Sequence, residues 1–273
     1  MCLAAVAINT HPDFPFVCLA NRDEFHDRPT APLHAWEDEA GTLYAGKDMQ
    51  SGGTWLGVGS NAEFALLTNV RNSTLNMPGT APSRGALVVN AIQNGHGPGE
   101  AESVYYAGFN LIHGNLGSLA LRYTSNQGLR LNNGFPFSSA LRQGIHTLSN
   151  GHLDAPWPKS RRLKEGLTAE IDKSISSPVE LPEFEQSLLT LLEHTGLADD
   201  GELPSTGVPH EWEKMLSAVK IISPLYGTRS SAIMLLDRHH TVHFTEITFD
   251  TAGREIERQR FEIPLPPNSP YTS

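Results

Sequence analysis

The hydrophobic and polar positions near the start of the chain form two short apolar runs separated by turn residues. Residues 3–9 are apolar and lead into a Thr-His-Pro-Asp turn, and residues 16–20 form the second run. Neighbouring runs of this kind predict an antiparallel β-hairpin. If the turn centres on its Pro-Asp pair, Cys2 lies opposite Asp23, to within about two residues. The hairpin then brings the polar run 21–24 beside Cys2, unless a β-bulge shifts the register.

Further along the chain, the pattern predicts strands, then helices, then strands again. Residues 28–53 are rich in Pro and Gly, which predicts loops and short strands. Strands are predicted over 55–58, 64–70, 109–113, 116–123, 145–149, 218–222, 230–236, 241–248 and 257–263. Apolar residues at helical spacing predict helices over 83–94, 159–173 and 182–195. This order predicts an α+β fold of mainly antiparallel sheets, with residues 1–273 as one domain.

Composition and charge exclude several classes of protein. The chain has 39% hydrophobic and 18% charged residues, which is typical of a globular protein. Its formal net charge of -10 argues against nucleic-acid partners and against docking on anionic membranes. No signal-peptide pattern or bilayer-spanning run is present, so we expect a cytoplasmic protein with no integral membrane segment. With only 2 cysteines and no metal-binding motif, we expect neither a metal site nor a cofactor.

Cys2 carries the most distinctive chemistry of the sequence. Cysteine is small enough for Met1 to be removed, which would give Cys2 a free α-amine. Reference pKa values are about 7.7–8.0 for the amine and about 8.5 for the thiol, so the amine can accept the thiol proton. A nucleophile and its base would then belong to one residue. The alternative is an ordinary cysteine in a short apolar strand.

Polar residues at strand ends supply candidate partners for Cys2. Arg22 beside the thiol would favour the thiolate, and Asp23 or Glu24 would hold the amine by a charge-assisted hydrogen bond. Asn69, at the end of another strand, can donate to a developing oxyanion or simply form an Asx-turn. These residues are candidate catalytic groups, and a solvated strand exit is the alternative for the polar run.

A further set of residues is predicted to bind substrate. Arg229 lies in a Tyr-Gly-Thr-Arg turn that can aim it into a cleft, where it would bind a carboxylate; an exposed arginine is the alternative. We count it among the catalytic candidates. The candidate substrate-binding residues are Trp55, Arg71, Asn150, Trp157 and Ser230. Trp157 fits packing at least as well as ligand binding.

Taken together, these motifs resemble the NRDE family, also called the transport and Golgi organisation 2 family. The motifs that carry the resemblance are Met-Cys at 1–2, Ala-Asn-Arg-Asp-Glu-Phe at 20–25, Gly-Gly-Thr-Trp-Leu-Gly at 52–57, Ser-Arg-Gly at 83–85, Leu-Ser-Asn at 148–150 and Tyr-Gly-Thr-Arg at 226–229. The resemblance implies a four-layer αββα sandwich of the N-terminal-nucleophile hydrolase type. Its similarity to cysteine amidases of that group implies catalytic roles for Cys2, Arg22, Asp23, Asn69 and Arg229.

One departure from those amidases concerns the second strand. The amidases separate their arginine and aspartate, whereas Arg22 and Asp23 are adjacent here. Adjacent residues of a strand face opposite ways, so Arg22 and Glu24 are expected on one face and Asp23 on the other.

Two functions are compatible with the resemblance. The first is hydrolysis of a non-peptide linear amide by Cys2. The second is a non-catalytic carrier of haem or lipid on the same scaffold, since animal members of the family are linked to Golgi organisation and haem trafficking. The expected partner is therefore a small amide substrate or a ligand such as haem.

Overall fold

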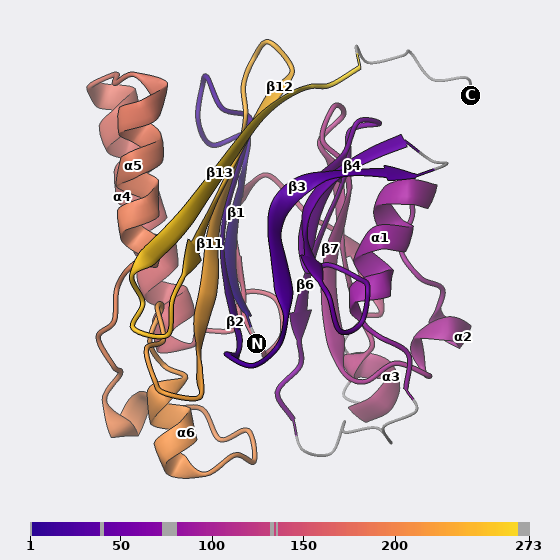
Figure 1. The fold of residues 1–273 in the computed structure, drawn as a ribbon, viewed down its shortest axis with the longest axis vertical. Helices are drawn as coiled ribbons and strands as arrows, with labels where there is room; N and C mark the ends of the chain where they lie inside the picture. The colour runs from indigo at the N-terminus through magenta and orange to yellow at the C-terminus, as the bar shows by residue number, and fades with distance from the viewer. Residues whose placement is uncertain (1, 39–40, 73–80, 132–133, 135, 267–273) are drawn as a thin grey trace.

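The computed structural model describes residues 2–38, 41–72, 81–131, 134 and 136–266, and its strands form two sheets that face each other (Figure 1). The strands of the first sheet are β1 (Cys2–Ile8), β2 (Phe16–Phe25), β10 (Gly144–Leu148), β11 (Tyr226–Leu236), β12 (Thr241–Phe249) and β13 (Glu255–Pro264). Those of the second sheet are β3 (Thr30–Asp38), β4 (Gly41–Asp48), β5 (Leu56–Gly59), β6 (Glu63–Asn69), β7 (Phe109–Asn115), β8 (Ala120–Ser125) and β9 (Ser138–Ala140). The first sheet runs β10-β1-β2-β11-β12-β13, and the second runs in sequence order from β3 to β9.

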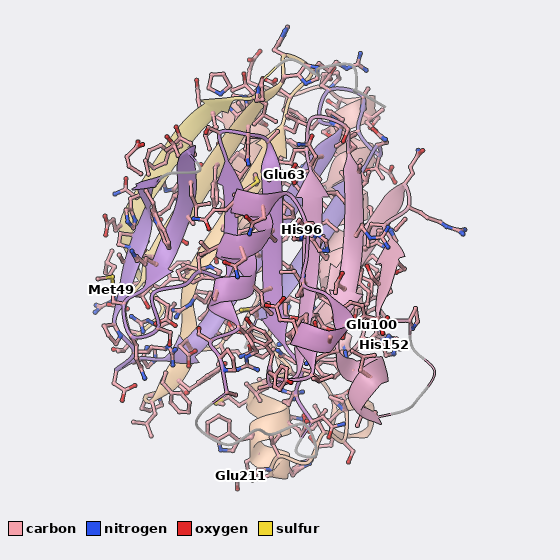
Figure 2. All side chains as sticks on the ribbon, turned by 90° about the vertical axis from the view of Figure 1, so that its right-hand side faces the viewer. Met49, Glu63, His96, Glu100, His152 and Glu211 are labelled. Atoms are coloured by element: carbon pink, nitrogen blue, oxygen red, sulfur yellow. The ribbon has the colours of Figure 1, made fainter. Side chains whose placement is uncertain are left out.

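Helices cover the outer faces of both sheets. The helical segments are α1 (Gly85–Asn94), α2 (Glu100–Ser103), α3 (Gln127–Leu131), α4 (Pro158–Ser176), α5 (Leu181–Leu192), a short 3₁₀ helix (Asp200–Glu202) and α6 (His210–Met215). Helices α4 and α5 lie against the first sheet, and α1 lies across the second, as Figure 2 shows from the side of α1. Among the helices of the described residues, none combines the length and apolar character needed to cross a bilayer.

Apolar side chains hold the four layers together. Leu163 and Leu167 of α4 pack with Leu3 and Leu19 on the outer face of the first sheet. Leu87, Val88 and Ile92 of α1 pack with Ala65 and Leu111 of the second sheet. A third cluster fills the space between the sheets, and includes Val6, Cys18, Phe64 and Phe244. The predicted αββα sandwich of mainly antiparallel sheets is therefore confirmed.

Strand alternation decides which face of the first hairpin reaches the space between the sheets. The registered pairs include Cys2 with Arg22 and Val6 with Cys18, one residue from the predicted register. The loop is centred on Pro12 rather than on the Pro-Asp pair, because Ile8 pairs with Phe16. Cys2 and Arg22 therefore share the face that lies toward the second sheet.

Two segments differ from the predicted pattern. Residues 28–53 form the long paired strands β3 and β4 rather than mainly loops. The predicted strand over 218–222 is irregular chain instead. The side chains of Ala218, Val219 and Ile221 are buried, whereas that of Ile222 is exposed. The backbone groups find other partners: the Val219 oxygen accepts from the Asn21 side chain at 2.9 Å, and the Lys220 N–H donates to the His194 backbone oxygen at 2.9 Å. An apolar run indicates burial, but a buried segment need not form a β-strand when its backbone N–H and C=O groups have other hydrogen-bond partners.

Candidate active site

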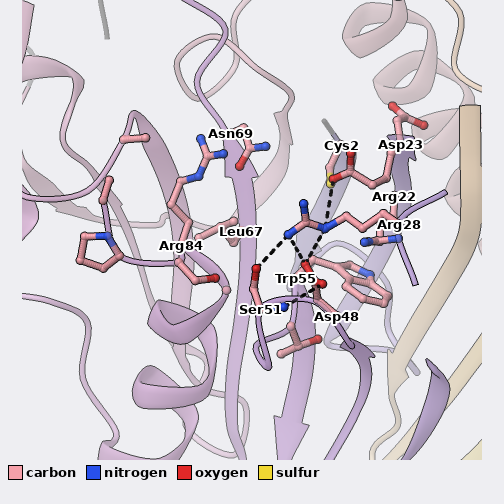
Figure 3. A pocket seen from close by; sticks show the side chains of 17 residues that line it. Cys2, Arg22, Asp23, Arg28, Asp48, Ser51, Trp55, Leu67, Asn69 and Arg84 are labelled. Carbon is pink, nitrogen blue, oxygen red and sulfur yellow. Dashed lines mark hydrogen bonds and ion pairs between the residues drawn. The ribbon is translucent and has the colours of Figure 1, made fainter. Parts of the chain in front are cut away.

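A cavity of about 310 Å³ opens between the sheets where β1 begins and where β2 and β6 end (Figure 3). The first sheet contributes residues 2 and 22–24 to its walls, and the second sheet contributes Asp48, Leu67 and Asn69. The rest of the lining comes from connecting segments: Arg28, Ser51, Thr54, Trp55, residues 81–85 at the start of α1, and Ala107. Cys2, Arg22, Asp23, Glu24, Asn69 and Trp55 are thus brought together from separate parts of the sequence.

The Cys2 thiol lies partly buried in this cavity, opposite Arg22. Burial raises the pKa of the thiol and the negative charge of Asp23 adds to that rise, while the positive charge of Arg22 and a hydrogen bond from the Asp23 backbone act to lower it. Burial is the larger effect, so the thiol needs a base to become a thiolate near neutral pH. The α-amine that removal of Met1 would expose is such a base; Met1 itself lies outside the described residues.

Arg22 is held rigidly in the wall of the cavity. Its side chain is buried, its Nη1 donates to Thr30 Oγ1 at 3.1 Å, and its guanidinium lies 4.3 Å from the centre of the Trp55 ring. A guanidinium over an indole face is stabilised by the ring quadrupole. Within the described part of the chain it makes no ion pair, so its charge remains directed at the cavity.

Asp23 points the other way, toward the helical layer, as strand alternation predicts. The carboxylate accepts a hydrogen bond from Thr228 Oγ1 at 2.7 Å, and the Asp23 backbone oxygen accepts from the Tyr226 hydroxyl at 2.9 Å. Burial raises the pKa of Asp23, and the charges of Lys159 and Arg22 act against that rise. Because Asp23 stands at the end of β2, it still lines the cavity.

Lys159 is a residue that the sequence analysis missed. It is the second residue of α4, its side chain is fully buried, and its Nζ has no hydrogen-bond partner among the described residues. Burial lowers the pKa of Lys159 to about 8, and Asp23 and Cys2 act against that fall. A signal was present: Lys159 precedes the buried Leu163 and Leu167 at intervals of four, so it lies on the buried face of the helix.

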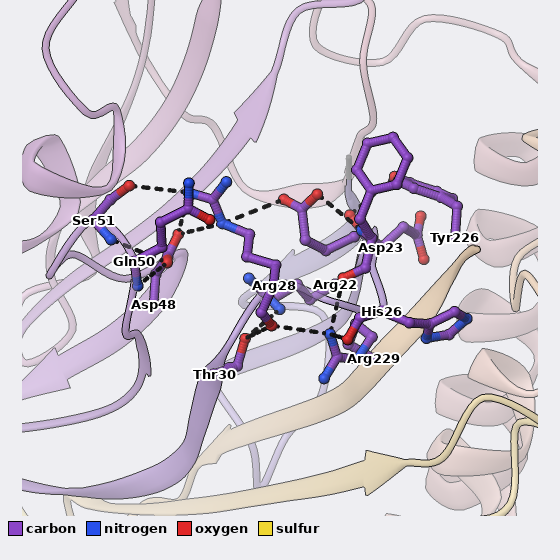
Figure 4. Close-up of polar contacts among 12 residues, drawn as sticks. Arg22, Asp23, His26, Arg28, Thr30, Asp48, Gln50, Ser51, Tyr226 and Arg229 are labelled. Carbon is purple, nitrogen blue, oxygen red and sulfur yellow. Dashed lines mark hydrogen bonds and ion pairs between the residues drawn. The ribbon is translucent and has the colours of Figure 1, made fainter.

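Glu24 lines the cavity and belongs to a polar network with Arg28, whose partners Asp48 and Ser51 are labelled with it in Figure 4. Its Oε2 lies 3.9 Å from Arg28 Nε, and its Oε1 accepts from the Phe25 N–H at 2.9 Å. Arg28 pairs more closely with Asp48, at 2.7 Å, and donates to Ser51 Oγ at 3.0 Å. Glu24 and Asp48 are therefore both tied to Arg28, which is a second residue that the sequence analysis gave no role.

Asn69 faces the cavity and is fixed from behind by Asn150. The buried Asn150 side chain donates from Nδ2 to the Asn69 backbone oxygen at 2.8 Å. The Asn150 backbone oxygen in turn accepts from the Arg71 N–H at 2.8 Å. Asn150 does not line the cavity; its side chain holds the Asn69 backbone in position.

Other predicted site residues lie outside the cavity lining. Arg229 donates from Nη1 to the backbone oxygens of Phe25, His26 and Arg28 at 2.9–3.2 Å and so fastens the turn after β2 (Figure 4). It is the extra residue of a bulge in β11, between Thr228 and Ser230.

Arg71 and Trp157 form a separate buried cluster. Arg71 pairs with Glu213 of α6 at 2.8 Å, with both side chains 5% exposed, and lies 4.8 Å from the Trp157 ring centre. The pair joins α6 to the chain after β6, so it ties distant segments together rather than facing the cavity.

Ser230 is paired in register with Arg22 and lies beside the buried Glu246. Glu246 Oε1 accepts from the Leu33 N–H at 2.8 Å, which links β12 to β3 across the sheets. Burial raises the pKa of Glu246 to about 7, against the hydrogen bonds from Leu33 and Ser230. This carboxyl group is a further titratable residue that the sequence analysis did not single out.

Arg84 is the remaining cavity residue without a predicted role. It precedes α1, is half-buried, and donates from Nη1 to the Gly108 backbone oxygen at 3.0 Å. The Ser-Arg-Gly motif at 83–85 was the available signal, since it was already part of the family resemblance.

Comparison with known proteins agrees with the fold and the motifs. The chain is 30% identical over 249 residues to the human Transport and Golgi organization protein 2 homolog, covering 85% of this chain and 86% of that protein. It is 27% identical to the Drosophila melanogaster Transport and Golgi organization protein 2, covering 91% and 92% of the two chains. Among solved structures, penicillin V acylase from Agrobacterium tumefaciens superposes with a TM-score of 0.50 and 13% identity, over 89% of this chain and 82% of the acylase.

The acylase likeness supports the shared fold, that of the N-terminal-nucleophile hydrolases, and at that identity it says nothing about substrate. The sequence likeness is more specific, because the model of the Transport and Golgi organisation 2 family matches residues 1–251. Together with the relatives from human and fly, this match shows that the chain belongs to the Transport and Golgi organisation 2 family.

Proposed function

We propose that this protein is a cysteine amidase in which Cys2, once Met1 is removed, cleaves a linear non-peptide amide. One observation carries the proposal: the Cys2 thiol opens onto a charged cavity directly opposite Arg22, and the same cavity is lined by Asn69. A nucleophile, a fixed positive charge and an amide donor in one cavity are the components that acyl transfer needs.

In the first half of the proposed reaction, the α-amine of Cys2 takes the thiol proton. The thiolate then attacks the amide carbonyl carbon, and the C=O π electrons move to the oxygen. Asn69 donates to this oxyanion from its side-chain amide. When the tetrahedral intermediate collapses, the C–N bond breaks and the ammonium of Cys2 gives its proton to the leaving amine. The product is an acyl thioester on Cys2.

In the second half, the same amine removes a proton from water, and the resulting hydroxide attacks the thioester. Collapse breaks the C–S bond, releases a carboxylic acid and returns the proton to the thiol. The raised pKa of Cys2 fits this scheme, because a thiol that is neutral at rest depends on an adjacent base. We assign the orientation of that base to Asp23, because Thr228 fixes its carboxylate on the helical side of β2 and its negative charge acts on Cys2.

The proposal is tested with N-acyl amides of 7-amino-4-methylcoumarin whose acyl chains have about two to twelve carbons, a range of chain lengths chosen to match the size of the cavity. Intact mass first establishes whether Met1 is removed. Release of aminocoumarin and an acyl adduct on Cys2 in acid-quenched samples are expected from the wild-type chain. Two controls separate the roles: Cys2→Ala removes the thiol, and a Gly-Ser extension before Cys2 keeps the thiol but converts its amine to an amide.

Both control variants should lack turnover, because one lacks the nucleophile and the other lacks the base. Turnover that survives in either variant would contradict the proposed mechanism. The carrier hypothesis would gain instead if no amide were hydrolysed and if haemin bound saturably to both wild type and Cys2→Ala.

A further inference from the structure

We propose that the cavity takes amides that carry an anionic group on the leaving amine, and that Arg84 is the side chain that recognises this anion. The inference rests on the proposed amidase function and specifies its substrate class. It follows from the way in which the charged groups of the cavity are already paired.

Three arginines line the cavity, and one of them is already neutralised. Arg28 lies 2.7 Å from Asp48 and 3.9 Å from Glu24, so it holds two of the carboxylates of the cavity. The third carboxylate, Asp23, is on the helical side of β2 and accepts from Thr228. Among the described residues, this pairing leaves both Arg22 and Arg84 without a carboxylate at ion-pair distance. Of these two, Arg22 is already packed against the Trp55 ring, which leaves Arg84 as the arginine available to a ligand.

Among the residues that the structure describes, the contacts of Arg84 leave most of its N–H donors available. One nitrogen, Nη1, donates to the Gly108 backbone oxygen at 3.0 Å, and no ion pair joins Arg84 to any residue that the structure describes. A guanidinium has five N–H donors, arranged as a fork that matches a carboxylate, sulfonate or phosphate. A half-buried guanidinium without an anion is poorly solvated, and a bound anion would relieve that penalty.

The position of Arg84 separates its role from that of Arg22. Figure 3 shows Arg84 beside Asn69 on one side of the cavity, with Cys2 and Arg22 on the other. Arg22 is committed to the Trp55 ring and Thr30, next to the thiol. An amide whose carbonyl lies between Cys2 and Asn69 would therefore have one of its two ends within reach of the wall that carries Arg84, and we assign that end to the leaving amine.

The start of α1 adds to the positive potential of this wall. Gly85 begins the helix and lines the cavity, and the first turn of α1 contains no acidic residue. The N-terminal end of a helix carries a partial positive charge, which nothing in this turn offsets. The cavity volume of about 310 Å³ is sufficient for a small anionic head group together with the scissile amide.

The experiment compares amides that differ chiefly in charge: N-octanoylglycine against N-octanoylethanolamine. N-octanoyltaurine and the phosphate ester of N-octanoylethanolamine distinguish a carboxylate from a sulfonate or a phosphate. We expect wild type to prefer one or more of the anionic amides, and added salt to weaken that preference. Arg84→Gln should lower kcat/KM for the preferred anionic amide by about 10- to 100-fold and for the neutral amide by less than about 3-fold. Arg84→Lys should restore part of the loss, and Arg254→Gln, on an exposed turn, serves as the matched control.

Equal losses on anionic and neutral amides in Arg84→Gln would overturn the proposal, because Arg84 would then act on the oxyanion or on the fold. A wild-type enzyme that hydrolyses the neutral amide as fast as the anionic ones would also overturn it, while leaving the amidase function intact.

Calorimetric binding to Cys2→Ala separates failure of the subsite from failure of the amidase function. Anion-selective binding that disappears in Cys2→Ala/Arg84→Gln, with no turnover by wild type, would uphold the subsite and refute the amidase. Absence of both binding and turnover for every amide would refute both proposals.

Discussion

The two cysteines of this chain lie on the same face of one hairpin, yet their surroundings differ. Cys18 pairs with Val6 and belongs to the apolar core between the sheets, and burial alone raises the pKa of its thiol. Cys2 pairs with Arg22 at the end of the same strands, where burial also raises the thiol pKa but Arg22 and the Asp23 backbone oppose it. Burial alone makes a thiol inert, whereas charge, hydrogen-bond donors and access make it a candidate nucleophile.

The largest expected effect comes from removing one sulfur at a time. Cys2→Ala should abolish amide hydrolysis, because the nucleophile is lost. Cys18→Ala should keep kcat and lower the free energy of unfolding by about 1 kcal/mol, the usual effect of a small deletion in a packed core. Turnover assays and urea unfolding of both variants measure the contrast. A Cys18→Ala enzyme as inactive as Cys2→Ala, while still folded, would break the comparison.

The next largest effect tests Asn69 as the hydrogen-bond donor to the oxyanion. Asn69→Ala removes the amide that faces the cavity, and we expect kcat to fall by about 10²–10³, as for other oxyanion donors. KM should change little, since the interaction strengthens mainly in the transition state. Steady-state kinetics measure both constants. If KM rises while kcat is unchanged, Asn69 binds substrate in the ground state instead.

The pH dependence of the free energy of unfolding distinguishes the polar end of the space between the sheets, which contains titratable groups, from its apolar middle. The folded-state pKa of Glu246, about 7, exceeds its usual 4.5, so the folded protein binds this proton more tightly than the unfolded chain. The resulting stabilisation is complete below pH 4.5 and is lost as pH rises through 7, a change of about 3 kcal/mol.

Glu246→Gln should remove this dependence, while its carbonyl oxygen can still accept from Leu33. Urea unfolding at pH 5 and pH 8 gives the comparison. The loss of stability between these two pH values should be about 3 kcal/mol smaller in the variant than in wild type. An unchanged difference would show that Glu246 does not titrate in this range.

The smallest effect concerns the pH profile of activity. Burial raises the pKa of Asp23, the charge of Lys159 opposes that rise, and the proposed mechanism needs Asp23 ionised. Lys159→Met should therefore raise the pKa of Asp23 and move the acidic limb of kcat/KM to higher pH. Lys159→Arg keeps the charge and should leave the limb near its wild-type position. Parallel loss of activity at all pH values in both variants would indicate a purely structural role.

Local patterns predicted much of this molecule because the physics that sets them is local. Alternation along β2 predicted Arg22 and Glu24 on one face and Asp23 on the other, and the αββα sandwich is confirmed. The predicted register set Cys2 opposite Asp23, one residue away from its observed partner Arg22. Helical spacing identified the buried face of α4, although its Lys159 was overlooked. The apolar run at 218–222 indicated burial correctly for all but Ile222 and secondary structure wrongly, because both a strand and well-paired irregular chain can bury such a run.

The sequence by itself determined the faces of the strands and helices, the cysteine near the start of the chain and the polar end of β2. Only the tertiary structure decided which distant charges meet. Arg28 reaches Asp48, Arg71 reaches Glu213 and Arg229 turns to the backbone after β2, whereas Arg84 is left facing the cavity. The reason is that periodicity fixes a side chain's direction within its own element, while pairing across layers depends on how the elements pack and on bulges such as that at Arg229.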